Sequence, residues 1–312
     1  MARTDAPLAK PPALKPGDQI RVVTPASPLT REKVEFTHAL LEREGYKLTY
    51  GKHCFDADHH LAGADRDRAS DLMEAFLDPE VAAILCSRGG YGCARLFPYI
   101  DLDAMASSRK LFAGFSDITT LHAPLNRRGL PTLHAPMALT LTNPREPWVY
   151  ESFKNALKGL NPIPAEAPRG QTLTAGIAKG KVVGGCLCLV CDTIGTPEEI
   201  ELEGCILILE DVDESPHRVD AMLTHLVNTG KIQLSAGIVV GEMTRSDERV
   251  DEGIGGKPWR EIVKDRLGGL GVPVMVDFPF GHNRNMLTLP LGVLAEMDAG
   301  AGTLTYLESH CE

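Results

Sequence analysis

Long hydrophobic runs are missing from this 312-residue sequence. No stretch approaches the ~20 consecutive apolar residues that a helix needs to cross a bilayer, so we expect no contact with a membrane. The opening residues, MARTDAPLAKPPALKPGDQ, also lack the apolar segment of a secretory signal and are rich in proline. We therefore expect residues 1–16 to form a loose N-terminal arm and the protein to be cytoplasmic.

Basic residues are outnumbered by acidic ones. The sequence has 32 Lys and Arg against 42 Asp and Glu, which gives a formal net charge of −10 at pH 7. Because the phosphates of nucleic acids bind to basic surfaces, this charge argues against nucleic acid as the main partner. A peptide or another small molecule is the more natural substrate.

The eight cysteines come without an export signal, so we expect reduced thiols and no disulfide framework. Four of them gather at Cys186, Cys188, Cys191 and Cys205. Their spacing superficially suggests zinc, but an apolar strand would place Cys186 and Cys188 on one face and Cys191 on the other. We therefore interpret these residues as buried structural thiols and expect no metal site.

The first half of the chain alternates strand-like and helix-like segments. The apolar run VAAILC at 81–86, for example, is typical of a parallel strand that is covered on both faces. The alternation predicts an α/β domain with a doubly wound parallel sheet, in which ligands bind beyond the carboxyl ends of the strands. The predicted strands are 19–26, 46–50, 81–86, 111–114 and 130–134, and the predicted helices are 30–43, 64–77 and 117–128.

A chain of this length is expected to form two domains. Residues 143–170 hold five prolines around one helical stretch, Tyr150–Leu157, and predict a connector. We expect an N-terminal α/β domain over 17–142, a linker over 143–178 and a mixed, β-rich C-terminal domain over 179–312. Its predicted strands are 181–189, 205–209, 237–240, 272–277 and 302–307, with a helix through 219–226.

Ser116 stands at the corner between a predicted strand and a predicted helix. Such a turn lifts a serine hydroxyl clear of the sheet, and the N–H groups at a helix start can face a developing oxyanion. In the alternative interpretation, Ser116 only caps the helix and Asp117 only complements its dipole. The segment does not match G-x-S-x-G, because Ile118 occupies the position of the second glycine, so both interpretations stay open.

A glycine-rich loop, SRGGYG at 87–92, follows the third predicted strand. Gly89 and Gly90 allow the backbone to approach a ligand closely, so their N–H groups could stabilise an oxyanion. Arg88 beside them could hold a substrate carboxylate. The alternative is a turn that simply requires glycine, next to an ordinary surface arginine.

A serine nucleophile needs a base, and the base needs a third group that orients it. The second half of the chain offers Glu210 at the end of an apolar strand and His282 in a loop between two strands. Asp211 and Glu214 lie close to Glu210, so the residues alone leave three carboxylates for one role. An acid that caps the next helix and a solvated loop histidine are the alternatives.

Four motifs together resemble the serine LD-carboxypeptidase family, peptidase family S66, which includes murein tetrapeptide carboxypeptidases and microcin C immunity peptidases. The resemblance covers nearly the whole chain, from Gly17 to Leu307, and the order of the motifs makes it specific. The motifs are SRGGYG at 87–92, GFSD at 114–117, LEDVDESPHRVDAML at 209–223 and FGHNRNMLTLPLG at 280–292. Smaller matches are VVTPASP at 22–28, DPEVAAILCSRGGYG at 78–92 and HAPM at 134–137.

The resemblance implies a triad of Ser116, Glu210 and His282, with an oxyanion hole formed by the backbone N–H groups of Gly90 and Asp117. It further implies an N-terminal domain like that of class I glutamine amidotransferases, a homodimer, and a reaction without metal or organic cofactor. The expected reaction is cleavage of an L-to-D amide bond, with release of terminal D-alanine from a cytoplasmic murein tetrapeptide. Candidates for substrate binding are Arg88, Gly89 and Tyr91.

Three positions depart from the family pattern. Cys186 replaces the usual asparagine of a Gly-Gly-Asn-Leu motif, and Asn283 follows His282 where the family usually has glycine. A tryptophan associated with the immunity branch is missing, and Thr193-Ile194-Gly195 stands there instead, which favours the murein branch. The alternatives are a peptidase for aminoacyl or peptidyl nucleotides and a two-domain binding protein with an inert serine.

Overall fold

The structure, a computed structural model, describes residues 8–142 and 144–312. The chain divides into two compact units. The first contains the chain up to Pro164 with Thr288–Gly292 and Ser309–Glu312, and the second contains Ala165–Leu287 and Val293–Glu308. The boundary between the two units, after Pro164, lies inside the segment predicted as a linker. The domain limits stay a prediction, because packing does not show which segments fold independently.

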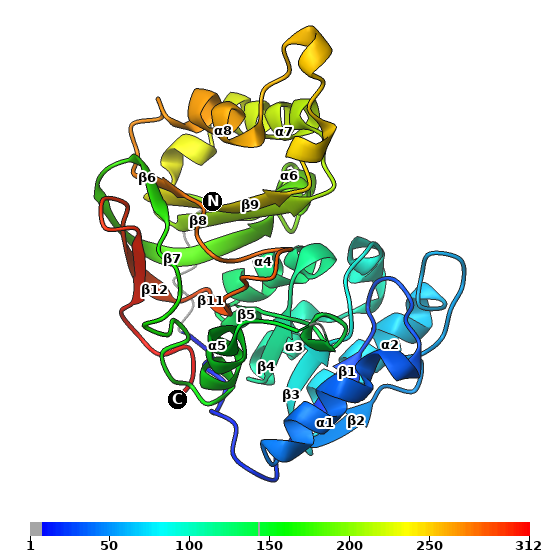
Figure 1. The fold of residues 1–312 in the computed structure, drawn as a ribbon. Coiled ribbons are helices and arrows are strands. Elements are labelled where there is room, and N and C mark those ends of the chain that lie inside the picture. The colour runs from blue at the N-terminus through cyan, green and yellow to red at the C-terminus, as the bar shows by residue number, and fades with distance from the viewer. Residues whose placement is uncertain (1–7, 143) are drawn as a thin grey trace. The chain divides into compact units, whose positions relative to one another are not determined.

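The first unit contains a six-stranded sheet of order β11-β5-β4-β3-β1-β2 (Figure 1). Its five early strands pair in parallel, as predicted, because each is followed by a helix that returns the chain to the same edge. Sequence reasoning missed the sixth strand, β11, which arrives from late in the chain and pairs antiparallel with β5. The strands are β1 Gln19–Val23, β2 Lys47–Tyr50, β3 Val81–Cys86, β4 Leu111–Gly114, β5 Thr132–His134 and β11 Leu289–Leu291.

Helices cover both faces of this sheet. On one face, alternate residues of β3 and β4 share a buried core with residues of α1 and α5. On the other face, Phe112 of β4 contacts Phe76 of α2 and His122 of α4, with ring centroids 5.5 and 5.6 Å apart. The predicted doubly wound arrangement is therefore confirmed. The helices are α1 Glu35–Arg43, α2 Asp65–Leu77, α3 Leu102–Ser107, α4 Thr119–Arg127 and α5 Pro147–Leu157.

The description of the N-terminal arm as loose is wrong for residues 8–16. Leu14 is buried in the core of the first unit, and its N–H donates to the carbonyl of Leu157 at 2.9 Å. The N–H of Ala9 donates to the carbonyl of Gly129 at 2.8 Å. An apolar side chain that covers the end of a core gains enough from burial to order a proline-rich segment. Residues 1–7 of the expected arm lie outside the described residues.

The second unit contains a seven-stranded sheet of order β13-β12-β7-β8-β9-β10-β6. Its centre, β7 to β10, is parallel, and the outer strands pair antiparallel, so the predicted mixed sheet is confirmed. The strands are β6 Gln171–Thr174, β7 Ile177–Cys186, β8 Ile206–Val212, β9 Gly237–Thr244, β10 Val274–Val276, β12 Leu294–Asp298 and β13 Thr303–Tyr306.

Three helices, α6 Leu187–Thr193, α7 Pro216–Asn228 and α8 Trp259–Leu267, lie on one side of β8 and β9 (Figure 1). The apolar face predicted for α7 is buried, as its spacing of i, i+3, i+4 and i+7 requires. The strand predicted over 181–189 is wrong at its end, because the chain turns into α6 directly after Cys186. Short 3-10 turns cover Arg31–Val34, Cys93–Tyr99, Ser116–Ile118, Thr140–Thr142, Ile232–Leu234, Asp247–Arg249 and Glu252–Ile254.

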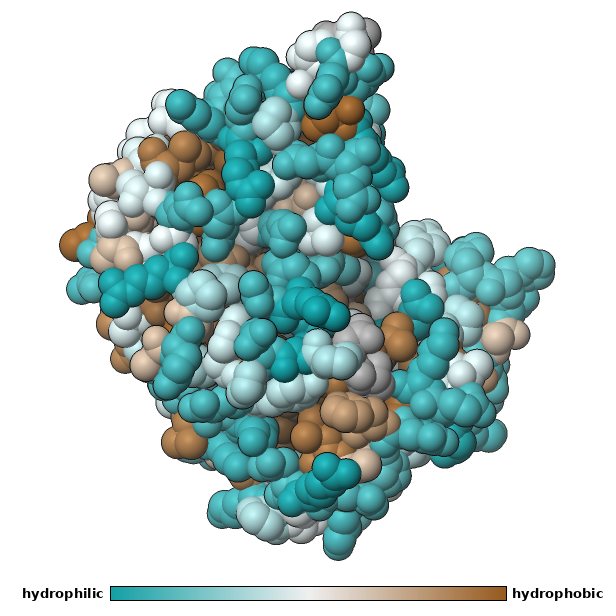
Figure 2. Space-filling view, in the orientation of Figure 1, coloured by the Kyte–Doolittle hydropathy of each residue, from teal (hydrophilic) through white to brown (hydrophobic). Residues whose placement is uncertain are grey.

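Hydrophilic residues cover most of the face that Figure 2 shows, and apolar residues form scattered patches among them. In the part of the chain that the structure describes, no helix combines the length and the apolar character needed to span a membrane.

Candidate active site

Ser116 occupies a strained turn between β4 and α4. Its φ angle is +65°, a left-handed conformation that costs a residue with a side chain about 1–2 kcal/mol. The residue begins a single 3-10 turn, Ser116–Ile118, which leads into α4. Neither helical start has a side-chain cap, so the interpretation of Ser116 as a capping residue is wrong. Strain of this kind is typical of functional turns.

Asp117 does more than complement a helix dipole. Its carboxylate is buried and accepts the N–H of Cys93 at 2.8 Å. This bond ties the turn that carries Ser116 to the start of the 3-10 segment Cys93–Tyr99, which follows the glycine-rich loop. The Asp117 carboxylate therefore fixes the backbone directly after Ser116.

The glycine-rich loop lies directly against Ser116. A Cβ atom at Gly89 would stand 2.7 Å from Cβ and 2.9 Å from Oγ of Ser116, so only glycine fits there. The same Cβ would lie 3.3 Å from the backbone nitrogen of Asp117. Gly90 has a φ angle of +115°, which a residue with a side chain rarely adopts. The backbones of Gly89 and Asp117 thus face each other at the serine.

Ser27, which sequence reasoning did not single out, supports this loop. Its N–H donates to the carbonyl of Gly89 at 3.3 Å, and its Oγ accepts the N–H of Tyr91 at 3.3 Å. Ser27 belongs to the segment VVTPASP, and that short match was the signal that could have found it.

The side chains of Arg88 and Tyr91, both predicted to bind substrate, differ in their contacts and exposure. The Arg88 guanidinium donates to the carbonyls of Gly89 and Pro28, each at 3.2 Å, so it braces the loop. The ring of Tyr91 is 51% exposed and lies 5.9 Å from that of His60. Tyr91 is therefore the better placed of the two to contact a ligand.

In the second unit, Glu210 of β8 holds His282. Glu210 Oε2 accepts a hydrogen bond from His282 Nδ1 at 2.6 Å and another from the His282 backbone N–H at 3.1 Å. The carboxylate is fully buried. A Cβ atom at Gly281 would lie 2.6 Å from Glu210 Oε2, so the glycine before the histidine makes room for this contact.

The Glu210 carboxylate also changes the acidity of the ring. Burial lowers the pKa of His282, but the negative charge of Glu210 and its hydrogen bond outweigh burial, so that the pKa lies above its ordinary value of 6.5. Because Nδ1 donates to a carboxylate, the other ring nitrogen, Nε2, is the one left to accept a proton. The pair can therefore act as an oriented base.

The other two candidate carboxylates point elsewhere. Asp211 Oδ2 accepts the N–H of Cys188 at 2.8 Å, and Glu214 lies 3.7 Å from the guanidinium of Arg218. Among the three acids that the sequence left open, Glu210 is the one that contacts His282. Asn283, which follows His282 where the family usually has glycine, does not have a positive φ angle, so this position does not require glycine.

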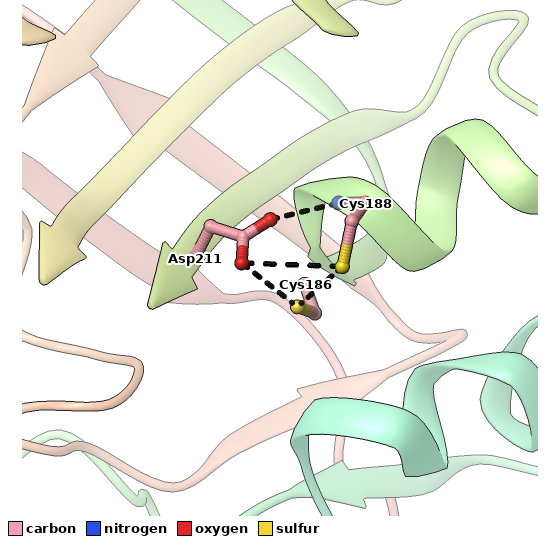
Figure 3. Close-up of side chains that lie close together, drawn as sticks. All are labelled: Cys186, Cys188 and Asp211. Atoms are coloured by element: carbon pink, nitrogen blue, oxygen red, sulfur yellow. Dashed lines mark hydrogen bonds between the residues drawn. The ribbon is translucent and has the colours of Figure 1, made fainter. Parts of the chain in front are cut away.

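The interpretation of the cysteine cluster needs correction. Cys186 ends β7, whereas Cys188 and Cys191 lie on α6, so the strand alternation assumed for them does not exist. The thiols of Cys186 and Cys188 are 3.4 Å apart and both face Asp211, as Figure 3 shows. Cys191 turns away and contacts the carbonyl of Met222 at 3.5 Å.

The predicted residues thus form two groups. Ser116 and the glycine-rich loop belong to the first unit, and Glu210 with His282 belongs to the second. Each group is preorganised within its own unit.

Two domain families match the chain. Residues 20–135 match the LD-carboxypeptidase N-terminal domain of peptidase family S66, and residues 179–297 match its C-terminal domain. A Streptomyces coelicolor protein named as a carboxypeptidase is 39% identical over 306 residues, and the match covers 96% of this chain and 96% of that protein. A Bacillus subtilis protein named as a murein peptide carboxypeptidase is 35% identical over 298 residues, covering 94% of this chain and 93% of its own.

The microcin C7 self-immunity protein MccF of Escherichia coli is more distant, at 27% identity over 337 residues, with 97% of this chain and 96% of MccF covered. A solved structure of MccF in complex with glutamyl sulfamoyl guanosine has a TM-score of 0.85 at 24% identity and covers 97% of this chain and 100% of MccF. This likeness shows a shared two-domain fold.

Proposed function

Because the chain belongs to peptidase family S66, the LD-carboxypeptidases, it is a serine-type carboxypeptidase, and we propose that Ser116, His282 and Glu210 are its catalytic triad. The observation that carries the proposal is the Glu210–His282 contact of 2.6 Å, which leaves Nε2 of the ring as a base. The φ angle of +65° at Ser116 adds support, since strained backbone positions cluster at active sites.

In the proposed reaction, His282 Nε2 takes the proton of Ser116 as Oγ attacks the carbonyl carbon of an L-to-D amide. The backbone N–H groups of Gly90 and Asp117 stabilise the resulting oxyanion. His282 then protonates the departing D-amino acid, Glu210 stabilises the imidazolium, and water hydrolyses the acyl-enzyme. Every step uses the chain's own residues, and no cofactor enters.

We propose a murein tetrapeptide that loses terminal D-alanine as the substrate. The 35% identical Bacillus subtilis relative, named for murein peptides, supports this class. A nucleotide substrate would need an aromatic surface for its base, yet three of the four aromatic residues of the second unit are at most 2% exposed, and the fourth, Tyr306, is only partly exposed. The proposal includes a cytoplasmic location and a homodimer. Sedimentation of the purified protein tests the homodimer.

A substrate panel tests the proposal directly. The enzyme should release D-alanine from murein tetrapeptide and leave aminoacyl-sulfamoyl adenosine intact. Faster hydrolysis of the nucleotide would instead assign the chain to the immunity type. A fluorophosphonate probe separates either peptidase from a binding protein: it should label the native protein and fail to label Ser116→Ala, and an unlabelled native protein would refute the serine mechanism.

A further inference from the structure

Three side chains that the proposed peptidase reaction does not use converge in the second unit (Figure 3). Cys186 comes from the end of β7, Cys188 from the first turn of α6 and Asp211 from β8. The two Sγ atoms are 3.4 Å apart, and Asp211 Oδ1 lies 3.5 Å from Sγ of Cys186 and 3.9 Å from Sγ of Cys188. Each residue therefore presents one potential ligand atom to a common point.

These separations resemble one face of a tetrahedral zinc site. With Zn–S bonds of about 2.3 Å and Zn–O bonds of about 2.0 Å, neighbouring sulfurs lie about 3.8 Å apart, and sulfur and oxygen lie about 3.5 Å apart. The three observed distances of 3.4, 3.5 and 3.9 Å each lie within about 0.4 Å of these values. A metal ion could enter with only small movements of the side chains.

The surroundings hold the carboxylate in place for such a role. Asp211 Oδ2 accepts the N–H of Cys188 at 2.8 Å, and Oδ1 accepts the N–H of Val212 at 2.8 Å. Asp211 and Cys186 are 2% and 3% exposed, whereas Cys188 is half-buried and is therefore the most exposed of the three residues. Fixed outer contacts of this kind orient metal ligands.

From this geometry we infer that Cys186, Cys188 and Asp211 form a binding site for a thiophilic divalent cation, for which Zn²⁺ is the natural candidate. On binding, each thiol loses its proton to solvent and the two thiolates and the carboxylate bind the ion. A fourth position stays open for water or another ligand. The sulfur ligands disfavour Mg²⁺ and Ca²⁺, which prefer oxygen.

The inference does not depend on the peptidase reaction. Its test uses a direct signal from the sulfur–metal bond: the reduced, metal-free protein is titrated with Co²⁺. One equivalent should produce thiolate-to-cobalt charge transfer and the visible bands of tetrahedral Co²⁺, and Zn²⁺ should abolish both. His53, Asp56 and Asp67 form a second cluster that could hold a metal, but it contains no sulfur and cannot give the charge-transfer band.

Variants identify the ligands. Cys188→Ser and Asp211→Asn should each weaken Co²⁺ binding by at least about a hundredfold, since loss of outer-shell partners alone costs tenfold to a hundredfold. Cys205→Ser is the matched control, because this half-buried thiol lies outside the cluster, and its titration should equal that of the native protein. Circular dichroism checks that each variant is folded. Cys186→Ser adds a third ligand test if Asp211→Asn does not fold.

Two results would overturn the inference. One is that the reduced native protein binds Co²⁺ without a charge-transfer band, or that Cys205→Ser loses the band to the same extent as the ligand variants. The other is thiol counting that shows Cys186 and Cys188 joined in a disulfide, together with no metal uptake after reduction. That second outcome would mean that Cys186 and Cys188 form a redox-active dithiol pair and do not bind a metal ion.

Discussion

The first unit positions Ser116 through its backbone, whereas the second unit positions His282 through a buried charge. At Ser116, a φ angle of +65° and the close approach of Gly89 set the geometry. At His282, the carboxylate of Glu210 accepts two hydrogen bonds and raises the pKa of the ring against the effect of burial. The position of the proposed nucleophile thus depends on shape and that of its proposed base on electrostatics, so substitutions should affect the two units differently.

The largest effect is expected from Ser116→Ala, which removes the proposed nucleophile. Its kcat should fall by about a millionfold, as when a triad serine is removed, while the melting temperature changes little. Release of D-alanine and thermal unfolding measure the two quantities. Near-native kcat in this variant would exclude Ser116 as the nucleophile.

Glu210→Gln should lower kcat by about ten-thousandfold, since an amide holds the ring but cannot stabilise its charge. It should also change the pH profile. Because Glu210 raises the pKa of His282, and the base must be neutral, kcat/KM of the native enzyme should rise through a pKa above 6.5. Removal of the charge lowers that pKa, so the acidic limb of the variant should move to lower pH.

The matched control is Glu214→Gln, which removes a nearby carboxylate that pairs with Arg218 and not with His282. Its acidic limb should stay at the native position. An unchanged limb in Glu210→Gln would mean that Glu210 does not orient His282, even if Ser116 is the nucleophile.

Gly89→Ala tests shape without changing charge. Its methyl group would stand 2.7 Å from Cβ of Ser116, so the serine must shift, and kcat/KM should fall by about a hundredfold. The pH profile should keep its native limb. Gly269→Ala is the control, because a Cβ atom there meets nothing within 4 Å, and its kcat/KM should match the native value.

The smallest effect concerns stability. Ser116→Gly should be inactive but should raise the free energy of unfolding by about 0.5–1 kcal/mol, because glycine adopts the left-handed conformation without strain yet gains freedom when unfolded. Ser70→Gly, in helix α2, should instead lower it by about 0.5 kcal/mol, the difference between the helix propensities of serine and glycine. Denaturant unfolding measures both. A destabilised Ser116→Gly would show that the turn is not strained.

Local patterns in the sequence determined much of the fold. The run VAAILC at 81–86 forms β3 over those same residues, and the helix predicted over 64–77 is α2, Asp65–Leu77. Both patterns depend only on near neighbours, since an apolar run or a 3.6-residue period is complete within one element. The turn at Ser116 was predicted from its own segment too, but its contact with Gly89, in the loop that follows β3, is a tertiary contact.

Tertiary structure decided what depends on distant partners. Residues 289–291 form a strand because they pair with the free edge of β5. Residues 8–16 are ordered because the side chain of Leu14 is buried in the core of the first unit. Which of Glu210, Asp211 and Glu214 contacts His282 depends on the direction of each side chain, which neighbours in sequence do not determine. Cys186 and Cys188 both contact Asp211 because β7 ends at Cys186 and α6 begins directly after it, which the alternation of a continued strand would not allow.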